Sequence, residues 1–381
     1  MPHQRRFTRT HPARYLIIAI LASCTGQRAP APPAPEDSPA NKNRQTADHK
    51  VSSRDHLAPT SRAENARTKA LHTITVFTAD AGPHLAFFGR ALGLKVIGPV
   101  TESLATRTAR RQLWGLPDEI DWRLYRLGRF DVPGVLNLHL VELTTETPHS
   151  RTTRDRRQPG PYAIGFPADE LVSWEREVRA LGYRATTAEM MRYPIPTPDG
   201  GQYEMHETIF EAPDNLHAVL LSRQGMSQPG SLDPRTGRGG PAYATLVVRD
   251  SDAMIRFFVE VLGLELRSDR EWGKGEKAYR FAILYAMGAS SGHLLLLDYR
   301  DHSLAPAVPP RPPHRGMAVL SFPVRDIDET RTRLRHAGIT PMPETVSYMH
   351  PEVGEVRAIG VHAPNGALIE LFEPTGPNPE P

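Results

Sequence analysis

Residues 78–96 read "TADAGPHLAFFGRALGLKV", and residues 248–266 repeat the pattern as "VRDSDAMIRFFVEVLGLEL". Each stretch carries apolar residues three and four positions apart, as Leu85, Phe88 and Leu92 do, which predicts an amphipathic helix. A glycine follows each helix and suits a C-cap that returns the chain to a strand. The chain therefore contains a duplicated strand–helix unit.

Two further units share this design. Residues 166–183 and 322–339 again predict strand, helix and glycine in that order. Both are followed by similar endings, "IFEAPDNLHAVLL" at 209–221 and "GVHAPNGALIELF" at 360–372. Pro-Asn-Gly in the second ending predicts a tight turn between two strands. Four helix-plus-strands units therefore begin near residues 71, 161, 241 and 315.

Composition narrows the class of protein. The 381 residues suffice for two domains of ordinary size. Lysine and arginine (46) nearly balance aspartate and glutamate (43), giving a net charge of +3, which argues against a nucleic-acid partner. The 37 prolines predict compact domains joined by proline-rich connectors.

The N-terminus predicts export. Four arginines precede the short apolar run "YLIIAILA" at 15–22, which is typical of a signal peptide over 1–23. The run ends in "LASC", which resembles the lipobox of bacterial lipoproteins and implies lipidation of Cys24, the single cysteine. Residues 24–69 lack apolar periodicity and predict a disordered Pro/Ala-rich tether. We therefore expect a lipid-anchored envelope protein on the periplasmic face of the outer membrane.

The four units resemble the vicinal oxygen chelate superfamily, which includes glyoxalase I, extradiol dioxygenases and bleomycin-resistance proteins. The resemblance rests on the "FFxxxLGL" helices and the "PNGxxIEL" ending. It implies an α+β fold in which four βαβββ units form two glyoxalase-like domains with curved mixed sheets. The expected domains span 70–225 and 241–375, with a linker at 226–240 and a tail at 376–381.

The resemblance also implies a place for a divalent metal such as Zn, Ni, Fe or Mn. Unit one offers His72, with one extra residue before Asp80, and Glu142. Unit two offers neither ligand, since Val219 stands at the glutamate position. Unit three offers Tyr243 and Asp298, and unit four offers Glu370 but no histidine on its first strand; His314 lies a few residues too early.

The pairing of the units decides whether these ligands meet. Units one and two together would leave His72 and Glu142 alone, and units three and four would supply oxygen ligands without imidazole. Units one and four together would bring His72, Glu142 and Glu370 around one ion, with Glu142 or Glu370 as a catalytic base. Each of these residues could instead be a polar strand residue without a metal.

The sequence leaves two functions open. The first is a metal-dependent lyase, isomerase or dioxygenase that acts on a small substrate with neighbouring oxygens. The second is a metal-free protein that binds or sequesters a small molecule, as bleomycin-resistance proteins do. Aromatic and apolar residues on the concave face of a curved sheet would then contact the ligand.

Overall fold

The structure is a computed structural model that describes residues 67–376, apart from 131, 133–135, 197–200, 274, 276–277, 302 and 305–307. The expected signal peptide, Cys24, nearly all of the tether and the end of the tail lie outside the described residues.

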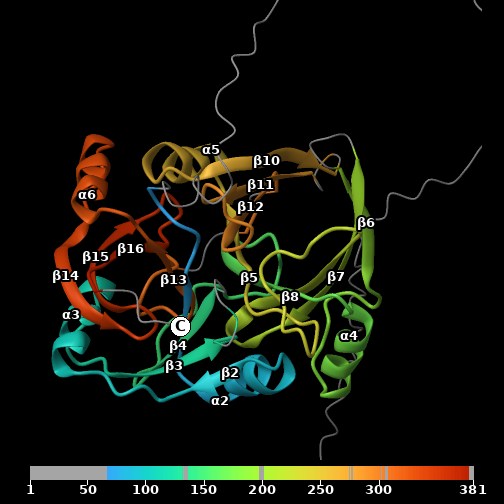
Figure 1. Cartoon of the computed structure of the whole chain (residues 1–381), viewed down its shortest axis with the longest axis horizontal. Coiled ribbons are helices and arrows are strands. Elements are labelled where there is room, and N and C mark those ends of the chain that lie inside the picture. Colours follow the sequence, from blue (N-terminus) through green and yellow to red (C-terminus); the bar gives the residue numbers. More distant parts are fainter. Residues whose placement is uncertain are drawn as a thin grey trace, which may run out of the picture. The chain divides into compact units, whose positions relative to one another are not determined.

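Apart from α3 in unit one and the short η2 in unit two, the four units have the order of elements that the repeat predicts (Figure 1). Unit one comprises β1 (Thr73–Thr78), α2 (Ala81–His84), η1 (Leu85–Ala91), β2 (Lys95–Ile97), α3 (Leu104–Trp114), β3 (Trp122–Gly128) and β4 (Asn137–Leu143). Unit two comprises β5 (Gly160–Pro167), α4 (Leu171–Ala180), β6 (Met191–Pro196), β7 (Gln202–Glu211), η2 (Pro213–Asn215) and β8 (His217–Gln224). Unit three comprises β9 (Tyr243–Val248), α5 (Ser251–Arg256), η3 (Phe257–Val261), β10 (Glu265–Trp272), β11 (Tyr279–Tyr285) and β12 (His293–Tyr299). Unit four comprises β13 (Gly316–Pro323), α6 (Ile327–His336), β14 (Met342–His350), β15 (Gly354–His362) and β16 (Leu368–Pro374).

The duplicated helices begin at equivalent aspartates and end at the glycines that the sequence predicts. Asp80 and Asp250 are N-caps whose carboxylates accept hydrogen bonds from the N–H groups of Gly82 (2.9 Å) and Ala253 (2.8 Å). Gly93 (φ 73°) and Gly263 (φ 81°) adopt the left-handed conformation that ends each helix. The second half of each helix, η1 or η3, has π-type hydrogen bonding.

The sheets pair the units across the chain. One eight-stranded sheet has the order β14-β15-β16-β13-β1-β4-β3-β2, and the other has the order β10-β11-β12-β9-β5-β8-β7-β6. The first sheet therefore joins units one and four through antiparallel β1 and β13, and the second joins units two and three through β5 and β9. Each sheet draws one unit from 70–225 and one from 241–375, so the sheets do not coincide with the two successive domains expected from the sequence. Antiparallel pairing of first strands thus joins units one and four, which are distant in the chain, and units two and three, which are consecutive.

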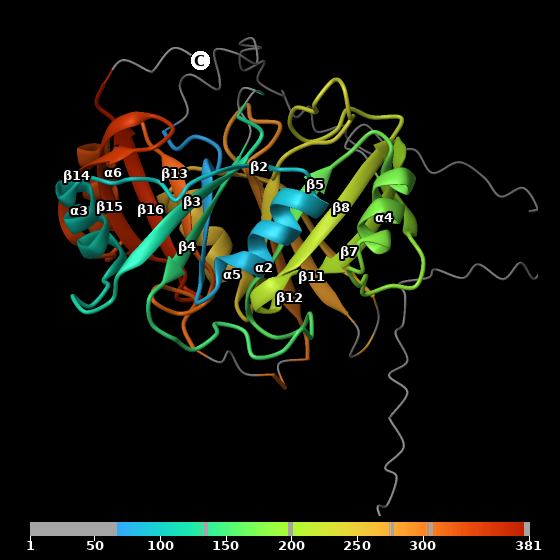
Figure 2. The same cartoon turned by 90° about the horizontal axis from the view of Figure 1, so that it is seen from below.

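The two faces of each sheet have different roles. The largest buried cluster lies on the faces covered by α2, α4, α5 and α6, and includes Phe88, Phe166, Phe258 and Phe322. Figure 2 shows α2 and α5 near the centre of the structure and α4 against β7 and β8. The opposite faces carry two separate clusters, one in each sheet. These are the faces on which the superfamily resemblance places a ligand.

Helix α3 was not anticipated from the sequence, and it lies on the ligand-side face of the first sheet. Its buried Ala109, Leu113 and Trp114 join the cluster of that face and pack toward β14 and β15. The ring of Trp114 lies edge-on to those of Phe77 (5.2 Å) and Trp122 (5.6 Å). The helix therefore fills much of a surface that a ligand would otherwise occupy.

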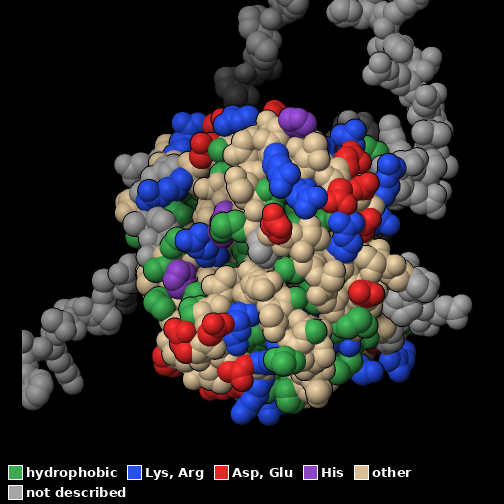
Figure 3. All heavy atoms as spheres, turned by 90° about the vertical axis from the view of Figure 1, so that its left-hand side faces the viewer, with side chains coloured by type: hydrophobic (Ala, Val, Ile, Leu, Met, Phe, Trp, Pro, Cys, Tyr) green, Lys and Arg blue, Asp and Glu red, His purple; other side chains and the backbone are tan. Residues whose placement is uncertain are grey.

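The outer surface beside β14 and α6 has mixed charge. In Figure 3, basic and acidic side chains alternate over this side of the structure. The mixture agrees with the near balance of charges in the sequence. Within the described ranges, no helix is long and apolar enough to cross a membrane.

Candidate functional site

Glu142 lies on the helix-covered face of the first sheet. On β4, Leu138 and Leu140 belong to the cluster under the helices, whereas Val141 and Leu143 belong to the cluster with α3. Because side chains alternate along a strand, Glu142 shares the face of Leu138 and Leu140. Its carboxylate accepts hydrogen bonds from the N–H of Ala81 (3.1 Å) at the start of α2 and from the hydroxyl of Tyr125 (3.4 Å).

The role of Glu142 recurs in units three and four. In unit three, Asp298 accepts a hydrogen bond from the N–H of Ser251 (3.0 Å) at the start of α5. In unit four, Glu373 does the same for Ile327 (3.4 Å) at the start of α6. Glu142 is therefore a helix-capping residue, which corrects the expectation that it binds a metal beside Glu370 or acts as a base there.

Glu370 does lie on the face that holds α3, between Leu368 and Phe372. The side chain is buried, and its carboxylate accepts hydrogen bonds from Ser321 Oγ (2.5 Å) and from the Tyr348 hydroxyl. Burial and the negative charge of Glu370 raise the pKa of Tyr348 well above its ordinary value. Both carboxylate oxygens of Glu370 are thus already satisfied by protein donors.

His72 lies at the start of β1 and turns toward the α3 side. Its ring is edge-on to those of His350 (5.3 Å) and Phe372 (5.5 Å), and its Nδ1 lies 2.8 Å from the hydroxyl of Thr73. Burial, followed by the nearby His350, lowers the pKa of His72 to about 3. The imidazole is therefore neutral at physiological pH.

The three predicted ligands do not converge. His72 and Glu370 share a face of the first sheet, whereas Glu142 lies on the opposite face. Among the described residues, no group of three histidine, cysteine, aspartate or glutamate side chains is arranged to hold a metal ion. Tyr243 and Asp298 are likewise divided between the two faces of the second sheet, because β12 Leu297 and Tyr299 lie with Tyr243 in one cluster and Asp298 caps a helix.

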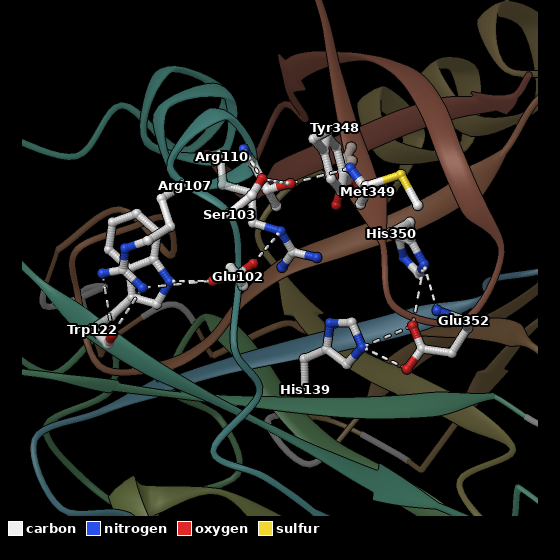
Figure 4. A network of polar contacts seen from close by, with 12 residues as sticks. Glu102, Ser103, Arg107, Arg110, Trp122, His139, Tyr348, Met349, His350 and Glu352 are labelled. Atoms are coloured by element: carbon white, nitrogen blue, oxygen red, sulfur yellow. Dashed lines mark hydrogen bonds and ion pairs between the residues drawn. The ribbon is translucent and has the colours of Figure 1, made fainter.

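The sequence analysis missed a polar cluster built by both units of the first sheet (Figure 4). Glu352, in the turn between β14 and β15, lies 2.9 Å from Nε2 of His139 on β4 and 3.1 Å from Nδ1 of His350. Arg126 on β3 donates its Nε–H to the same carboxylate (2.6 Å). Burial alone would raise the pKa of Glu352, but the neighbouring His139 and His350 hold it well below its usual range.

A comparison of the capping residues shows how this cluster was missed. Glu142 and Glu373 have the same role in units one and four, so His139, three residues before Glu142, is equivalent to Glu370, three residues before Glu373. The residue of unit one that corresponds to Glu370 is therefore a histidine. Equating Glu142 with Glu370 displaces unit one by three positions relative to unit four. Because an odd displacement reverses the face of a strand, the error placed the candidate ligand on the wrong side of the sheet.

A cavity of about 480 Å³ remains beside the N-terminus of α3. Its size is within the range of small-molecule sites, which runs from about 300 to 1,000 Å³. Glu102 in its wall accepts a hydrogen bond from Trp122 Nε1 (3.1 Å) and forms an ion pair with Arg110 Nε (3.0 Å), as Figure 4 shows. The lining consists of Val100, Thr101, Glu102, Ser103, Thr106, Leu124, Met349, His350, Pro351, Glu352 and Gly354.

The corresponding face of the second sheet is aromatic, and no described helix packs on it. The buried cluster of this face and the alternation along its strands place seven of the 11 tyrosines here, together with Trp272 and Phe281. These tyrosines are Tyr162, Tyr193, Tyr203, Tyr243, Tyr279, Tyr285 and Tyr299. Burial raises the pKa of Tyr162, Tyr193 and Tyr243. We call this surface the tyrosine face.

The second sheet curls so far that its two edge strands meet. β10 and β6 are the terminal strands of the sheet, yet the rings of Trp272 and Tyr193 lie edge-on at 6.4 Å. In Figure 1, β10 to β12 form the upper arm of this sheet and β7 and β8 form its lower arm. The tyrosine face is therefore the inner surface of a curled sheet.

Ring stacking makes one wall of the tyrosine face rigid. The buried ring of His293 stacks on Tyr243 (4.7 Å) on one side and Tyr285 (4.3 Å) on the other. Gly165 makes room for Tyr243, because a Cβ at this position would lie 1.9 Å from the Cε1 atom of the ring. Burial lowers the pKa of His293 well below its ordinary value, so the stacked imidazole is neutral.

The sequence is similar to those of known proteins with this architecture. Residues 240–371 match the model of the Glyoxalase/Bleomycin resistance protein/Dioxygenase superfamily. The uncharacterized protein YurT of Bacillus subtilis is 26% identical over 129 residues, which cover 34% of this chain and 94% of YurT.

Solved structures share the fold over most of the chain. A single-residue mutant of glyoxalase I from Zea mays superposes with a TM-score of 0.54 at 15% identity, covering 83% of this chain and 96% of that one. A putative dioxygenase from Bacillus subtilis gives a TM-score of 0.51 at 16% identity, covering 82% and 87%. Residues 240–371 therefore belong to the glyoxalase/bleomycin-resistance/dioxygenase, or vicinal oxygen chelate, superfamily, and the four βαβββ units in two curled mixed sheets show that the described chain as a whole has the glyoxalase-like fold.

Proposed function

We propose that this protein binds a small, largely apolar molecule on the tyrosine face, without metal chemistry. The observation that carries the proposal is the concentration of aromatic side chains on the inner surface of the second sheet. Small-molecule sites are concave and are lined mainly by apolar and aromatic side chains, with a few polar groups that orient the ligand. Tyrosine supplies both, since each ring offers a broad apolar surface and a hydroxyl at its tip.

The contrast between the two sheets supports this location. On the first sheet, α3 covers the equivalent surface with Ala109, Leu113 and Trp114. On the second sheet, Met205, Ile209, Tyr279, Phe281 and Leu295 are only partly buried. A ligand there would remove apolar surface from water, which stabilises a complex by roughly 25 cal/mol for each Å² buried.

The residues that the resemblance implies as metal ligands are not arranged to bind a divalent metal. Members of the superfamily commonly use such ions, with carboxylate and imidazole ligands. Here Glu142 caps a helix on the other face, and Glu370 is bonded to Ser321 and Tyr348. Glu352 in the neighbouring cluster is engaged by His139 and by the guanidinium of Arg126. Binding a metal would require these carboxylates to leave their present donors, so we derive no metal-dependent step.

Ligand binding can be tested with intrinsic tryptophan fluorescence, to which Trp272 on the tyrosine face contributes beside the three other tryptophans of the chain. The neutral aromatic probe N-phenyl-1-naphthylamine is expected to quench this fluorescence through energy transfer in a saturable manner. Tyr279→Leu, which removes a ring from the face, should weaken binding several-fold. Tyr183→Leu is the matched control, because Tyr183 packs on Phe87 under the helices (4.9 Å). Equal loss in both variants, or no saturable binding by the wild type, would overturn the proposal.

We also propose that the chain is exported and anchored by lipid at Cys24 on the periplasmic face of the outer membrane. The sequence "LASC" after an apolar run supports this, and Cys24 lies outside the described residues. Metabolic labelling with a palmitate analogue in a bacterial host should mark the wild type but not Cys24→Ser. A wild-type protein that stays unlabelled and is released with the soluble fraction would contradict the anchor.

A further inference from the structure

Glu207 is a carboxylate in the midst of the tyrosine face. It lies on β7, directly across from Met191 on β6 and Leu221 on β8, and it is partly buried. Its carboxylate accepts a hydrogen bond from the hydroxyl of Tyr193. A carboxylate among apolar and aromatic side chains is costly unless it gains a partner, because water can no longer solvate its charge.

The groups that face Glu207 are mainly phenols. Tyr193, Tyr243, Tyr279 and Tyr162 all feel its charge, which acts to raise their pKa values. Burial raises the pKa of Glu207 itself, and the hydrogen bond from Tyr193 opposes that rise.

Four arginines are placed against tyrosine rings of this surface, and two of them are Arg151, 5.2 Å from the ring centroid of Tyr162, and Arg156, 5.8 Å from that of Tyr299. Arg223 on β8 pairs with Met205, two residues before Glu207, and its guanidinium lies 5.8 Å from the ring centroid of Tyr203. Arg267 lies 4.1 Å from the ring centroid of Tyr285. The rings of this surface therefore already attract cations through their faces, as the quadrupole of an aromatic ring predicts.

We propose that the tyrosine face selects organic cations, with Glu207 as the counter-ion and the surrounding tyrosine rings as cation–π partners. The preferred ligand carries a quaternary or protonated amine attached to an apolar body. The amine is placed beside Glu207, and the apolar body covers the rings and aliphatic side chains around it. This inference rests on the proposed function, because it names the class of ligand for the same surface.

The selectivity for cations follows from the negative charge of Glu207, which is partly removed from water. An ion pair with a cation offsets the cost of removing the Glu207 carboxylate from water, and the cation is also attracted by the faces of the surrounding rings. A neutral ligand of the same shape gains the apolar contact alone. An anionic ligand is repelled by the carboxylate, so the surface discriminates by charge as well as by shape.

A matched pair of ligands tests the inference. Phenyltrimethylammonium and tert-butylbenzene have the same shape and differ by one positive charge. We expect the wild-type protein to bind the cation at least about 10-fold more tightly, on the scale of cation–π and charge-pair effects. In Glu207→Gln this preference should fall to about 2-fold or less, while the affinity for tert-butylbenzene stays unchanged.

Glu211→Gln is the control variant. Glu211 lies four residues further along β7 on the same face, but its carboxylate is already paired with Arg154 (3.0 Å). Its replacement should leave the cation preference within about 2-fold of wild type, because a charge pair near the surface contributes little. Equal losses in Glu207→Gln and Glu211→Gln would overturn the assignment of Glu207.

The pH dependence of binding by the wild-type protein gives a test that needs no variant. Protonation of Glu207 removes the counter-ion, so affinity for phenyltrimethylammonium should fall as the pH is lowered through the pKa of this carboxyl, which burial raises above its ordinary value. Affinity for tert-butylbenzene should not change over the same range. A cation preference that is independent of pH would overturn the role of Glu207.

The outcomes separate the two proposals. If neither ligand binds, the proposed function fails and the selectivity fails with it. If both ligands bind equally and Glu207→Gln has no effect, binding on the tyrosine face stands and cation selection is refuted.

Discussion

Replacement of Gly165 by alanine should force apart the stacked rings of the tyrosine face. An alanine Cβ would lie 1.9 Å from Cε1, 2.2 Å from Cζ and 2.5 Å from Cδ1 of Tyr243. Ordinary contact begins at 3.4 Å, so the ring must move by about 1.5 Å, the difference between 3.4 and 1.9. The obstacle is a ring held at 4.7 Å from His293, rather than the end of a flexible side chain.

The expected cost follows from this displacement. Inserting a methyl group into a well-packed region destabilises a protein by about 1–3 kcal/mol. Tyr243 is 7% exposed, so its ring cannot swing freely into water. We therefore expect Gly165→Ala to lower the free energy of unfolding by about 1–3 kcal/mol, without a change in the denaturant slope.

Urea unfolding followed by circular dichroism measures the cost. Gly376→Ala is the control, since nothing lies within 4 Å of its added Cβ, and it should unfold like the wild type. Shortening the ring partner should relieve the clash, so Gly165→Ala in a Tyr243→Val background should cost about 0.5 kcal/mol or less. Wild-type stability in the single variant, or an undiminished cost in the Tyr243→Val background, would refute the packing argument.

Four further predictions concern polar side chains. Glu352→Ala should lower stability at pH 7 by about 3–5 kcal/mol, because it leaves Arg126 and two histidines without their shared carboxylate. Glu352 stabilises the folded state above its unfolded pKa, and this contribution is lost as the pH falls through its lowered folded pKa. In acid, the free energy of unfolding of the variant should therefore depend less on pH than that of the wild type. His217 is 1% exposed with a pKa lowered to about 3 by burial, so the unfolded chain binds its proton first as pH falls below 6.5. His217→Leu should therefore gain stability relative to wild type as the pH falls from 6.5 to about 3, as measured by denaturant titrations at several pH values. Glu142→Gln should cost about 0.5–2 kcal/mol through the weakened cap of α2. Elemental analysis of Glu142→Gln and His72→Ala should give the same metal content as the wild type, and stoichiometric metal lost in both would contradict the separation of their faces.

Local sequence patterns were sufficient for the repeated elements. The apolar spacing of Leu85, Phe88 and Leu92, the capping carboxylate of Asp80 and the turn at Gly93 lie within one short stretch. Helix formation and helix ends depend on neighbours a few residues away, so such patterns predict them well. The superfamily resemblance that these repeated units carry implied the α+β class, and the two mixed eight-stranded sheets confirm it.

Side-chain direction at the site could not be predicted with the same accuracy. Glu142 and His139 are three residues apart on β4, and that offset separates a helix cap from a member of the polar cluster. Strand side chains alternate, so an error of one or three residues exchanges the two faces of a sheet. Helix α3 was missed because nothing in the other three units corresponds to it within the described residues.

The sequence by itself determined that this chain has four related units, and it supplied the tyrosines, histidines and carboxylates. Only the tertiary structure decided that unit four pairs with unit one, that α3 covers one inner face, and that tyrosines from residues 162 to 299 surround Glu207 on the other. The reason is physical: a helix is specified by contacts between near neighbours, whereas a sheet face is assembled by hydrogen bonds between strands that are far apart in the chain.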